Sequence, residues 1–152
     1  MRELNRINQW QSRLDKVITD MMATPLTYST NDCMTLAIRT IKAVTGENIL
    51  DSPAVKAFAP SGLPEYHTED EANQVIADFG FANMEELLDA VLVRKRQIYA
   101  VPGDLIQHPT DHTIMGVLGG DMIHFLSLTD KPATAEAYSY VAPAWDVCQW
   151  VE

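Results

Sequence analysis

The feature that most constrains the fold is a change of apolar periodicity near Arg94. Before this point, apolar residues recur at spacings of three and four, which is typical of helices with one buried face. After it, short apolar runs between glycine- and proline-containing turns predict strands. Helices followed by strands indicate an α+β fold, with N-terminal helices packed on a small antiparallel sheet or an open barrel. The 152 residues suffice for one core, so we assign residues 1–152 to a single domain.

Four helices are expected in the first part of the chain. Residues 3–22 carry one apolar stripe over about five turns. A second helix begins at Asn31 or Asp32, because either side chain can accept a hydrogen bond from an unpaired backbone amide. Two short helices follow, capped by Thr68 and Asn83, each with a glutamate three residues later.

The rest of the chain divides into an irregular stretch and a run of strands. Residues 47–67 contain three prolines and no clear period, so we expect a long surface connection. Gly119-Gly120-Asp121 between two apolar runs is a hairpin signal. The expected strands are residues 105–107, 113–118, 122–126, 138–141 and 144–151.

Composition argues against several classes of protein. The 21 acidic and 11 basic residues give a formal net charge of −10, which disfavours nucleic acid and anionic membrane surfaces as partners. No apolar run approaches the roughly 20 residues that span a bilayer, so no membrane insertion is expected. The N-terminus is too polar for a secretory signal peptide. Cys33 and Cys148 form no disulfide framework, and no cysteine or histidine spacing suggests a metal or another cofactor.

Cys33 is the leading candidate for chemistry, because it lies in the first turn of the second expected helix. The positive end of a helix and its free amide donors stabilise a thiolate, which is the reactive form of cysteine. A nucleophilic cysteine also needs a base within hydrogen-bond reach. The alternative is that Cys33 is a small buried apolar residue. The histidines available as a base, each with a structural role as its alternative, are His67, His108, His112 and His124.

Several short motifs, taken in order, resemble the NlpC family of papain-like cell-wall cysteine peptidases. Asp32-Cys33 followed by Leu36 resembles its Asp-Cys-Ser-Gly-Leu/Phe nucleophile motif. The segments 103–106 and 115–124 resemble its Pro-Gly-Asp-Leu-Val strand and its hairpin. The resemblance implies a papain-like fold of the NlpC type, in which Cys33 attacks a peptide carbonyl of peptidoglycan and a histidine transfers the proton.

The likeness is closer to a phage-encoded branch of that family found among tail-tip genes. The branch motifs have counterparts at Trp10/Arg13/Leu14, Pro25–Tyr28, Thr45-Gly46 and Ala144–Val147. This resemblance implies a virion protein of the tail tip, assembled in the host cytoplasm. Its partners would be other tail-tip or hub proteins, and its substrate a peptidoglycan peptide. Tyr28 stands where the branch has an aromatic residue and, with Asp32, is a candidate for substrate binding; the alternative is that Tyr28 packs on the core.

The position of the catalytic base departs from the family. The histidine of the family stands two residues before the hairpin glycine, where this chain has Ile114, and isoleucine cannot take a proton. His112 lies two residues earlier, and His124 matches the polar residue that orients the base in the family. Both are therefore candidate catalytic residues. Reduced or absent peptidase activity follows as the second reading, with a non-catalytic docking component of the tail-tip hub as the alternative function.

The register of the hairpin decides whether His124 can help. If Gly119-Gly120-Asp121 forms a three-residue loop, His124 pairs with Gly116 and shares a face with Ile114. If only the two glycines turn, His124 pairs with Met115 and faces away. The first register would keep His124 near the helix that begins at Cys33.

Overall fold

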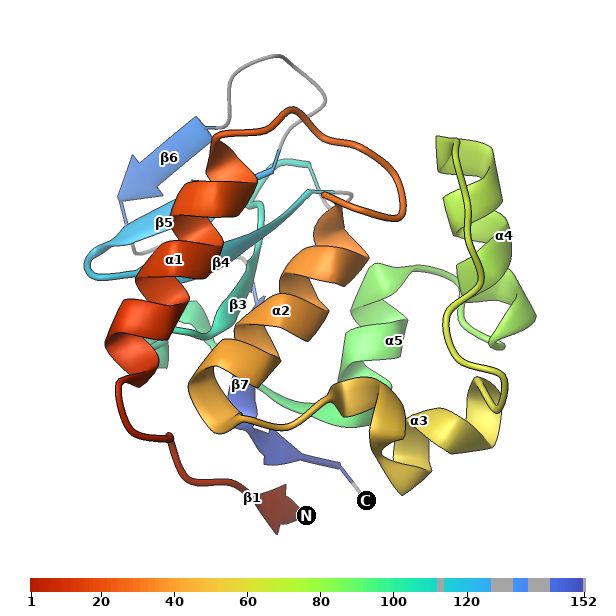
Figure 1. The fold of residues 1–152 in the computed structure, drawn as a ribbon, viewed down its shortest axis with the longest axis horizontal. Coiled ribbons are helices and arrows are strands. Elements are labelled where there is room, and N and C mark those ends of the chain that lie inside the picture. Colours follow the sequence, from red (N-terminus) through yellow and green to blue (C-terminus); the bar gives the residue numbers. More distant parts are fainter. Residues whose placement is uncertain (112–113, 127–132, 137–142, 152) are drawn as a thin grey trace.

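Helices cover one face of an antiparallel sheet in the computed structural model, which describes residues 1–111, 114–126, 133–136 and 143–151 (Figure 1). Along the sheet the strand order is β1-β7-β3-β4-β5-β6, and β2 pairs with β7 off this path. Within the described residues β1 and β6 end the path and the sheet is open, which confirms the α+β class with an antiparallel sheet. The strands are β1 (Arg2–Glu3), β2 (Leu92–Arg96), β3 (Leu105–Gln107), β4 (Met115–Gly119), β5 (Met122–Phe125), β6 (Ala133–Glu136) and β7 (Pro143–Trp150).

The helices begin where side-chain caps predict them. Asp32, Thr68 and Asn83 each accept a hydrogen bond from the backbone N–H three residues later, which confirms the three predicted starts. Between the two alternatives for the second helix, Asp32 is therefore the cap. The helices are α1 (Trp10–Met22), α2 (Cys33–Thr45), α3 (Pro53–Phe58), α4 (Glu69–Asp78) and α5 (Met84–Val91), with 3-10 turns at η1 (Ile49–Asp51) and η2 (Gln97–Tyr99).

Successive side chains of a strand point to opposite faces of the sheet, and each face carries a hydrophobic core. Met115 and Val117 on β4 belong to the larger core, which lies between the sheet and the helices α1 and α2. Leu118 belongs to the smaller core on the opposite face, together with Ile106 and Phe125. The side of β4 that a residue occupies therefore determines whether it can approach α2.

The predicted first helix was wrong at its start, because α1 begins at Trp10 and not near residue 3. The backbone before it is used by neighbouring elements instead. The Leu4 N–H donates to the Cys148 carbonyl, and the Ile7 N–H donates to the Val44 carbonyl. An extended segment can make these two bonds, whereas a helix would direct the same N–H groups along its own axis. Tertiary hydrogen bonding thus overrides the helical spacing of Leu4 and Ile7.

Two stretches predicted to be irregular contain short regular elements. Residues 47–67 hold η1 and α3, and α3 carries a clear start signal, since Ser52 accepts a hydrogen bond from the Val55 N–H and Pro53 occupies the first turn. The expected loop before residue 138 contains β6, which pairs with β5. The predicted strand 138–141 lies outside the described residues.

The hairpin adopts neither of the two predicted registers. His124 pairs with Val117, and the turn consists of Gly120-Asp121, so Gly119 remains in β4. Gly120 has φ +65° at the first turn position, which suits the type II′ turns that match the twist of a hairpin. Gly119 also lies against α1, where a Cβ atom would approach Ile18 Cδ1 to 2.6 Å. Close packing of the strand on α1 therefore accounts for one glycine, and the turn accounts for the other.

The strand β7 lies inside the sheet, although it follows every other strand in the chain. It pairs with β2 on one side and with β1 and β3 on the other, because Trp150 pairs with both Arg2 and Leu92, and Trp145 pairs with both Arg94 and Leu105. Trp145 on β7 is fully buried, and its Nε1 donates to Asp89 Oδ1 at 2.9 Å. Figure 1 shows β7 behind α2, with the start of β1 and the end of β7 at the same end of the molecule.

Candidate active site around Cys33

Cys33 is the first residue of α2 and lies beside the hairpin strand β4. Its thiol receives a hydrogen bond from the backbone of Met115, which belongs to β4. The chain thus brings together a cysteine and a strand that are more than eighty residues apart in the sequence. First-turn amides of a helix lack acceptors inside the helix and concentrate positive partial charge beside the sulfur.

A cavity of about 170 Å³ opens next to the Cys33 side chain. Its walls come from the first turn of α2, the loop before it, the segment before α4, α4 itself and the start of α5. A smaller apolar cavity of about 40 Å³ lies between α2, α3 and α5, and Met34 and Met84 line both cavities. The residues of the larger cavity used below are Tyr28, Asp32, Cys33, Tyr66, Glu69 and Ile114.

The carboxylate of Asp32 organises the entrance to α2. Its Oδ1 accepts hydrogen bonds from the Thr35 N–H at 2.8 Å and from Thr35 Oγ1 at 2.9 Å. Its Oδ2 accepts from the Ser29 N–H at 2.8 Å and from the Tyr66 hydroxyl at 2.5 Å. Asp32 is only 4% exposed, so these donors rather than water compensate its charge. The predicted substrate-binding residue Asp32 is at the cavity, but its oxygens are occupied by the protein.

The loop before α2 is fixed by Asn31 and Ser29. The Asn31 Nδ2 donates to the backbone carbonyls of Met21, Thr24 and Pro25, which ties the loop to the end of α1. Thr27 and Asn31 form an isolated bridge across the loop, and Ser29 at its tip has φ +72°. A left-handed conformation is unfavourable for serine, so the surrounding hydrogen bonds must maintain it. Tyr28 is held within this loop.

Tyr28, a candidate for substrate binding, lines the cavity. Its ring meets the edge of the Tyr66 ring, with centroids 6.4 Å apart. Partial burial raises the pKa of the Tyr28 hydroxyl, and the carboxylate of Glu69 raises it further. The hydroxyl therefore stays protonated at neutral pH and can donate a hydrogen bond to a molecule in the cavity.

The thiol of Cys33 is protonated at neutral pH. Burial raises its pKa to about 11, and the carboxylates of Asp32 and Asp111 act in the same direction. The hydrogen bond from Met115 lowers the pKa but does not outweigh burial. The sequence-based expectation that the helix start would favour a thiolate is therefore incomplete, because it omitted the cost of removing a charge from water.

The described histidines lie away from the cavity lining. His124 sits on the same face of the hairpin as Val117, beside Gly119 and near Asp15 of α1, and burial lowers its pKa. His108 directly follows β3, and its Nδ1 accepts hydrogen bonds from the backbone N–H groups of Thr110 and Asp111. His67 is exposed and lies 3.9 Å from Glu65. Of the cavity-lining residues that the structure describes, none is a histidine.

The base position of the resemblance is occupied by an apolar side chain. Ile114 lines the same cavity as Cys33 and packs against the smaller core. His112, the other candidate base, lies outside the described residues. Its neighbour in the sequence, Asp111, is close enough to Cys33 to affect the thiol electrostatically.

A family model, described as a domain of unknown function (DUF6950), matches residues 5–147. The chain belongs to the DUF6950 family. No curated protein and no solved structure matches it.

Across the part of this DUF6950 chain that the structure describes, no three histidine, cysteine or acidic side chains gather as a metal site would require. Nor is any described helix both long and apolar enough to cross a membrane.

Sequence reasoning about the DUF6950 chain missed Tyr66. Its hydroxyl contacts Asp32 from 34 residues away, and its ring forms part of the cavity wall. Tyr66 stands between Pro64 and the cap of α4, in a stretch without periodicity. No local pattern marks such a residue; only its burial, at 3% exposure, distinguishes it from the surrounding surface segment.

Proposed function

We propose that this DUF6950 protein is a papain-like domain of the NlpC type with Cys33 as its nucleophile, ancestrally a peptidase of peptidoglycan stems. The observation that carries the proposal is the position of the Cys33 thiol. It lies at the start of α2, receives a backbone hydrogen bond from β4, and borders a cavity large enough for a side chain of a peptide. A helix start beside an antiparallel strand is the arrangement that the sequence motifs of that family imply.

The chemistry proposed is acyl transfer. A base removes the proton from Cys33 Sγ, and the sulfur attacks the peptide carbonyl. The C–N bond then breaks as the proton passes to the leaving amine, and water hydrolyses the thioester to release the acid and the thiol. First-turn amides of α2 are suited to stabilising the oxyanion, because they point toward the end of the helix where Cys33 lies.

The raised pKa of the thiol requires a base that acts after substrate has bound. With a pKa of about 11, Cys33 does not rest as a thiolate at neutral pH. His112 is the base we propose, since it follows Asp111 in the sequence and Asp111 interacts with Cys33. His124 is the second candidate and would have to act from its place beside α1.

We further propose that the protein acts in a phage tail tip and contacts other tail-tip or hub proteins there. The support is the ordered set of motifs shared with the phage-encoded branch, which extends from Trp10 to Val147. Delivery of a peptidase at the tip of a tail would place it against the cell wall, where its peptide substrate is found.

A second function is favoured by one specific observation. Ile114, an apolar residue, lines the cavity at the position where the family has its base. Together with a thiol that is hard to ionise, this supports a non-catalytic docking role in the tail-tip hub. In that case the acidic surface would attach the domain to basic surfaces of its neighbours.

Release of soluble peptides from purified peptidoglycan tests both functions. The wild type is compared with Cys33→Ala, His112→Ala and His124→Ala, and Cys148→Ala serves as the matched control because Cys148 is the other free cysteine. We expect release by the wild type and by Cys148→Ala, and none by Cys33→Ala. Loss in His112→Ala would identify the base. Equal release by the wild type and Cys33→Ala would overturn the peptidase, and no release by any folded protein would favour the docking role.

A further inference from the structure

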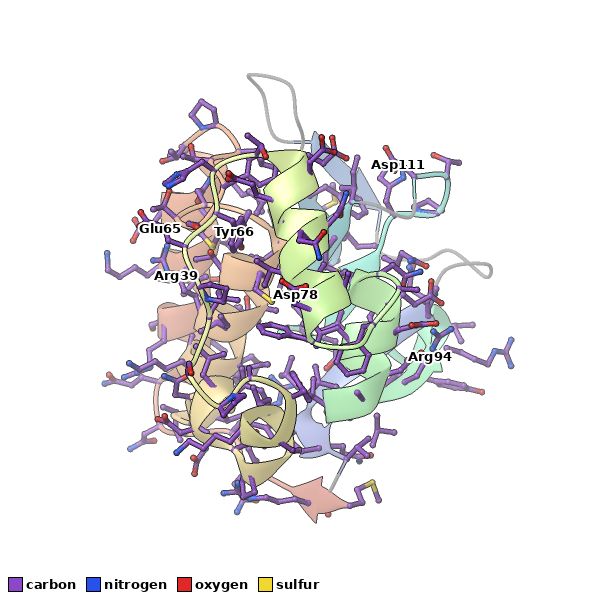
Figure 2. The ribbon with its side chains drawn as sticks, turned by 90° about the vertical axis from the view of Figure 1, so that its right-hand side faces the viewer. Arg39, Glu65, Tyr66, Asp78, Arg94 and Asp111 are labelled. Carbon is purple, nitrogen blue, oxygen red and sulfur yellow. The ribbon has the colours of Figure 1, made fainter. Side chains whose placement is uncertain are left out.

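Tyr66 connects the segment before α4 with the entrance to α2. We propose that Tyr66 is a positioning residue, which holds the Asp32 carboxylate in place and thereby sets the reactivity of the Cys33 thiol. The inference rests on the proposed function only for the role of Cys33 as a nucleophile. Figure 2 labels Tyr66 beside the extended segment that precedes α4, on the opposite side of α4 from Asp111 in that view.

The first argument is the geometry of the hydroxyl. Tyr66 Oη donates to Asp32 Oδ2 at 2.5 Å, and both residues are at most 4% exposed. The same carboxylate caps α2 through the Thr35 N–H. A hydrogen bond to a carboxylate that is shielded from water is among the stronger ones in a protein. Tyr66 therefore restrains the residue that directly precedes Cys33.

The second argument is that the backbone of Tyr66 is itself held by Ser29. Ser29 Oγ donates to the Tyr66 carbonyl at 2.7 Å and accepts from the Tyr66 N–H at 2.7 Å. The Ser29 N–H donates to Asp32 Oδ2 at 2.8 Å. Ser29, Tyr66 and Asp32 thus form a closed ring of hydrogen bonds. A tyrosine that only filled space would not need both backbone groups fixed to the loop that it supports.

The third argument concerns charge. The charged or titratable groups that face Cys33 in the described residues are Tyr28 and Asp32 before α2, Tyr66 before α4, Glu69 on α4 and Asp111 before β4. The Asp32 carboxylate disfavours a thiolate beside it. Each donor on that carboxylate disperses its charge and weakens the repulsion. The Tyr66 hydroxyl is such a donor, so it favours ionisation of Cys33 indirectly.

The Tyr66 hydroxyl can donate its hydrogen bond to Asp32 at neutral and mildly alkaline pH. Burial raises the pKa of its hydroxyl, and the hydrogen bond to Asp32 raises it further. The proton therefore remains on the oxygen when the protein is neutral or mildly alkaline. Removing only the hydroxyl, as in Tyr66→Phe, keeps the ring and its edge contact with Tyr28 while it withdraws the donor from Asp32.

Alkylation of Cys33 by iodoacetamide tests the proposal without any need for peptidase activity. Rates are measured between about pH 7.5 and 10 by mass spectrometry of the peptide that contains Cys33, which separates it from Cys148. We expect Cys33 in Tyr66→Phe to be alkylated at about one third of the wild-type rate or less at each pH. A rise of half a unit in the thiol pKa lowers the thiolate fraction by about threefold, and the thiolate is the form that reacts. Tyr99→Phe, an exposed tyrosine outside the cavity, is the matched control and should match the wild type.

The direction of the change separates positioning from packing. If the Tyr66 side chain only filled space, removal of its hydroxyl would leave alkylation of Cys33 unchanged, or would make it faster by loosening the packing around the hydroxyl. Either result overturns the proposal. Ser29→Ala, which removes the hydroxyl that holds the Tyr66 backbone, provides a second variant and should slow alkylation in the same direction. Slower alkylation in a protein that releases no peptides from peptidoglycan would retain the positioning role of Tyr66 and refute the peptidase.

Discussion

Replacing Asp32 with alanine should destabilise the protein far more than loss of an ordinary helix cap. The carboxylate accepts four hydrogen bonds, from two groups of Thr35, from the Ser29 N–H and from the Tyr66 hydroxyl. Alanine accepts none of them. The substitution therefore removes a cap and at the same time leaves donors without a partner in a region that water hardly reaches.

The size of the effect follows from these separate contributions. Loss of the cap costs about 1 kcal/mol. A buried donor left without a partner costs about 1–3 kcal/mol, and the Tyr66 hydroxyl is the most buried of the donors to Asp32. The free energy of unfolding should thus fall by about 3 kcal/mol in total. Since small domains are stable by about 5–15 kcal/mol, the variant should remain folded at room temperature.

Urea unfolding followed by circular dichroism measures this loss. The matched control is Asn83→Ala, which removes the cap of α5, where the side chain accepts one hydrogen bond at an exposed position. The control should lose about 1 kcal/mol. Asp32→Ala should shift the unfolding midpoint by about 1 M or more relative to wild type. If both variants lose the same stability, Asp32 is only a cap, and the reasoning about the loop around Cys33 fails.

Three further predictions concern the thiol and the hairpin. Because the pKa of Cys33 is about 11, its alkylation rate should rise about tenfold per pH unit from pH 7 to 10. A plateau below pH 9, measured by mass spectrometry of the peptide that contains Cys33, would contradict the conclusion that burial raises this pKa. The carboxylates of Asp32 and Asp111 place negative charge near the thiol, so a cationic methanethiosulfonate should modify Cys33 at least about three times as fast as an anionic one. Both rates are divided by the rates of the same reagents with free cysteine, and the reverse order would contradict a negatively charged cavity. Gly116→Ala should cost about 1–3 kcal/mol of unfolding free energy in a thermal melt, since its Cβ would lie 2.7 Å from the backbone oxygen of His124; an unchanged melting temperature would contradict the close approach of β4 and β5.

Local signals predicted the helices around the site well. The caps Asp32, Thr68 and Asn83 each bond a backbone group within three residues, so a short stretch of sequence contains both partners. The placement of Cys33 in the first turn of α2 follows directly from its neighbour Asp32. The prediction of a strand beside it rested on resemblance, and the structure brings Met115 to the thiol.

Non-local effects account for what the sequence could not supply. In the hairpin His124 pairs with Val117, one residue away from the first predicted register. Gly119 packs closely on Ile18 of α1, a contact between distant segments that local turn signals do not reveal. The pKa of Cys33 depends on burial by elements far apart in the chain. Tyr66 reaches Asp32 across 34 residues and belongs to no periodic segment. Each of these features is set by tertiary packing.

The place of β7 has a consequence for biosynthesis. The strands that flank β7 are all synthesised before it, and among the described residues none of β1, β2 and β3 pairs with another of the three. While a nascent chain lacks residues 143–150, β2 and β3 have no common partner, and the helices lack the Trp145 side chain that completes their core. The larger core can therefore close only after β7 has left the ribosome, and until then the exposed strand edges must be protected from aggregation. Shortening the chain before Pro143 would leave β3 to β6 as a sheet and would remove the strand with which β1 and β2 pair, so a smaller domain would not result.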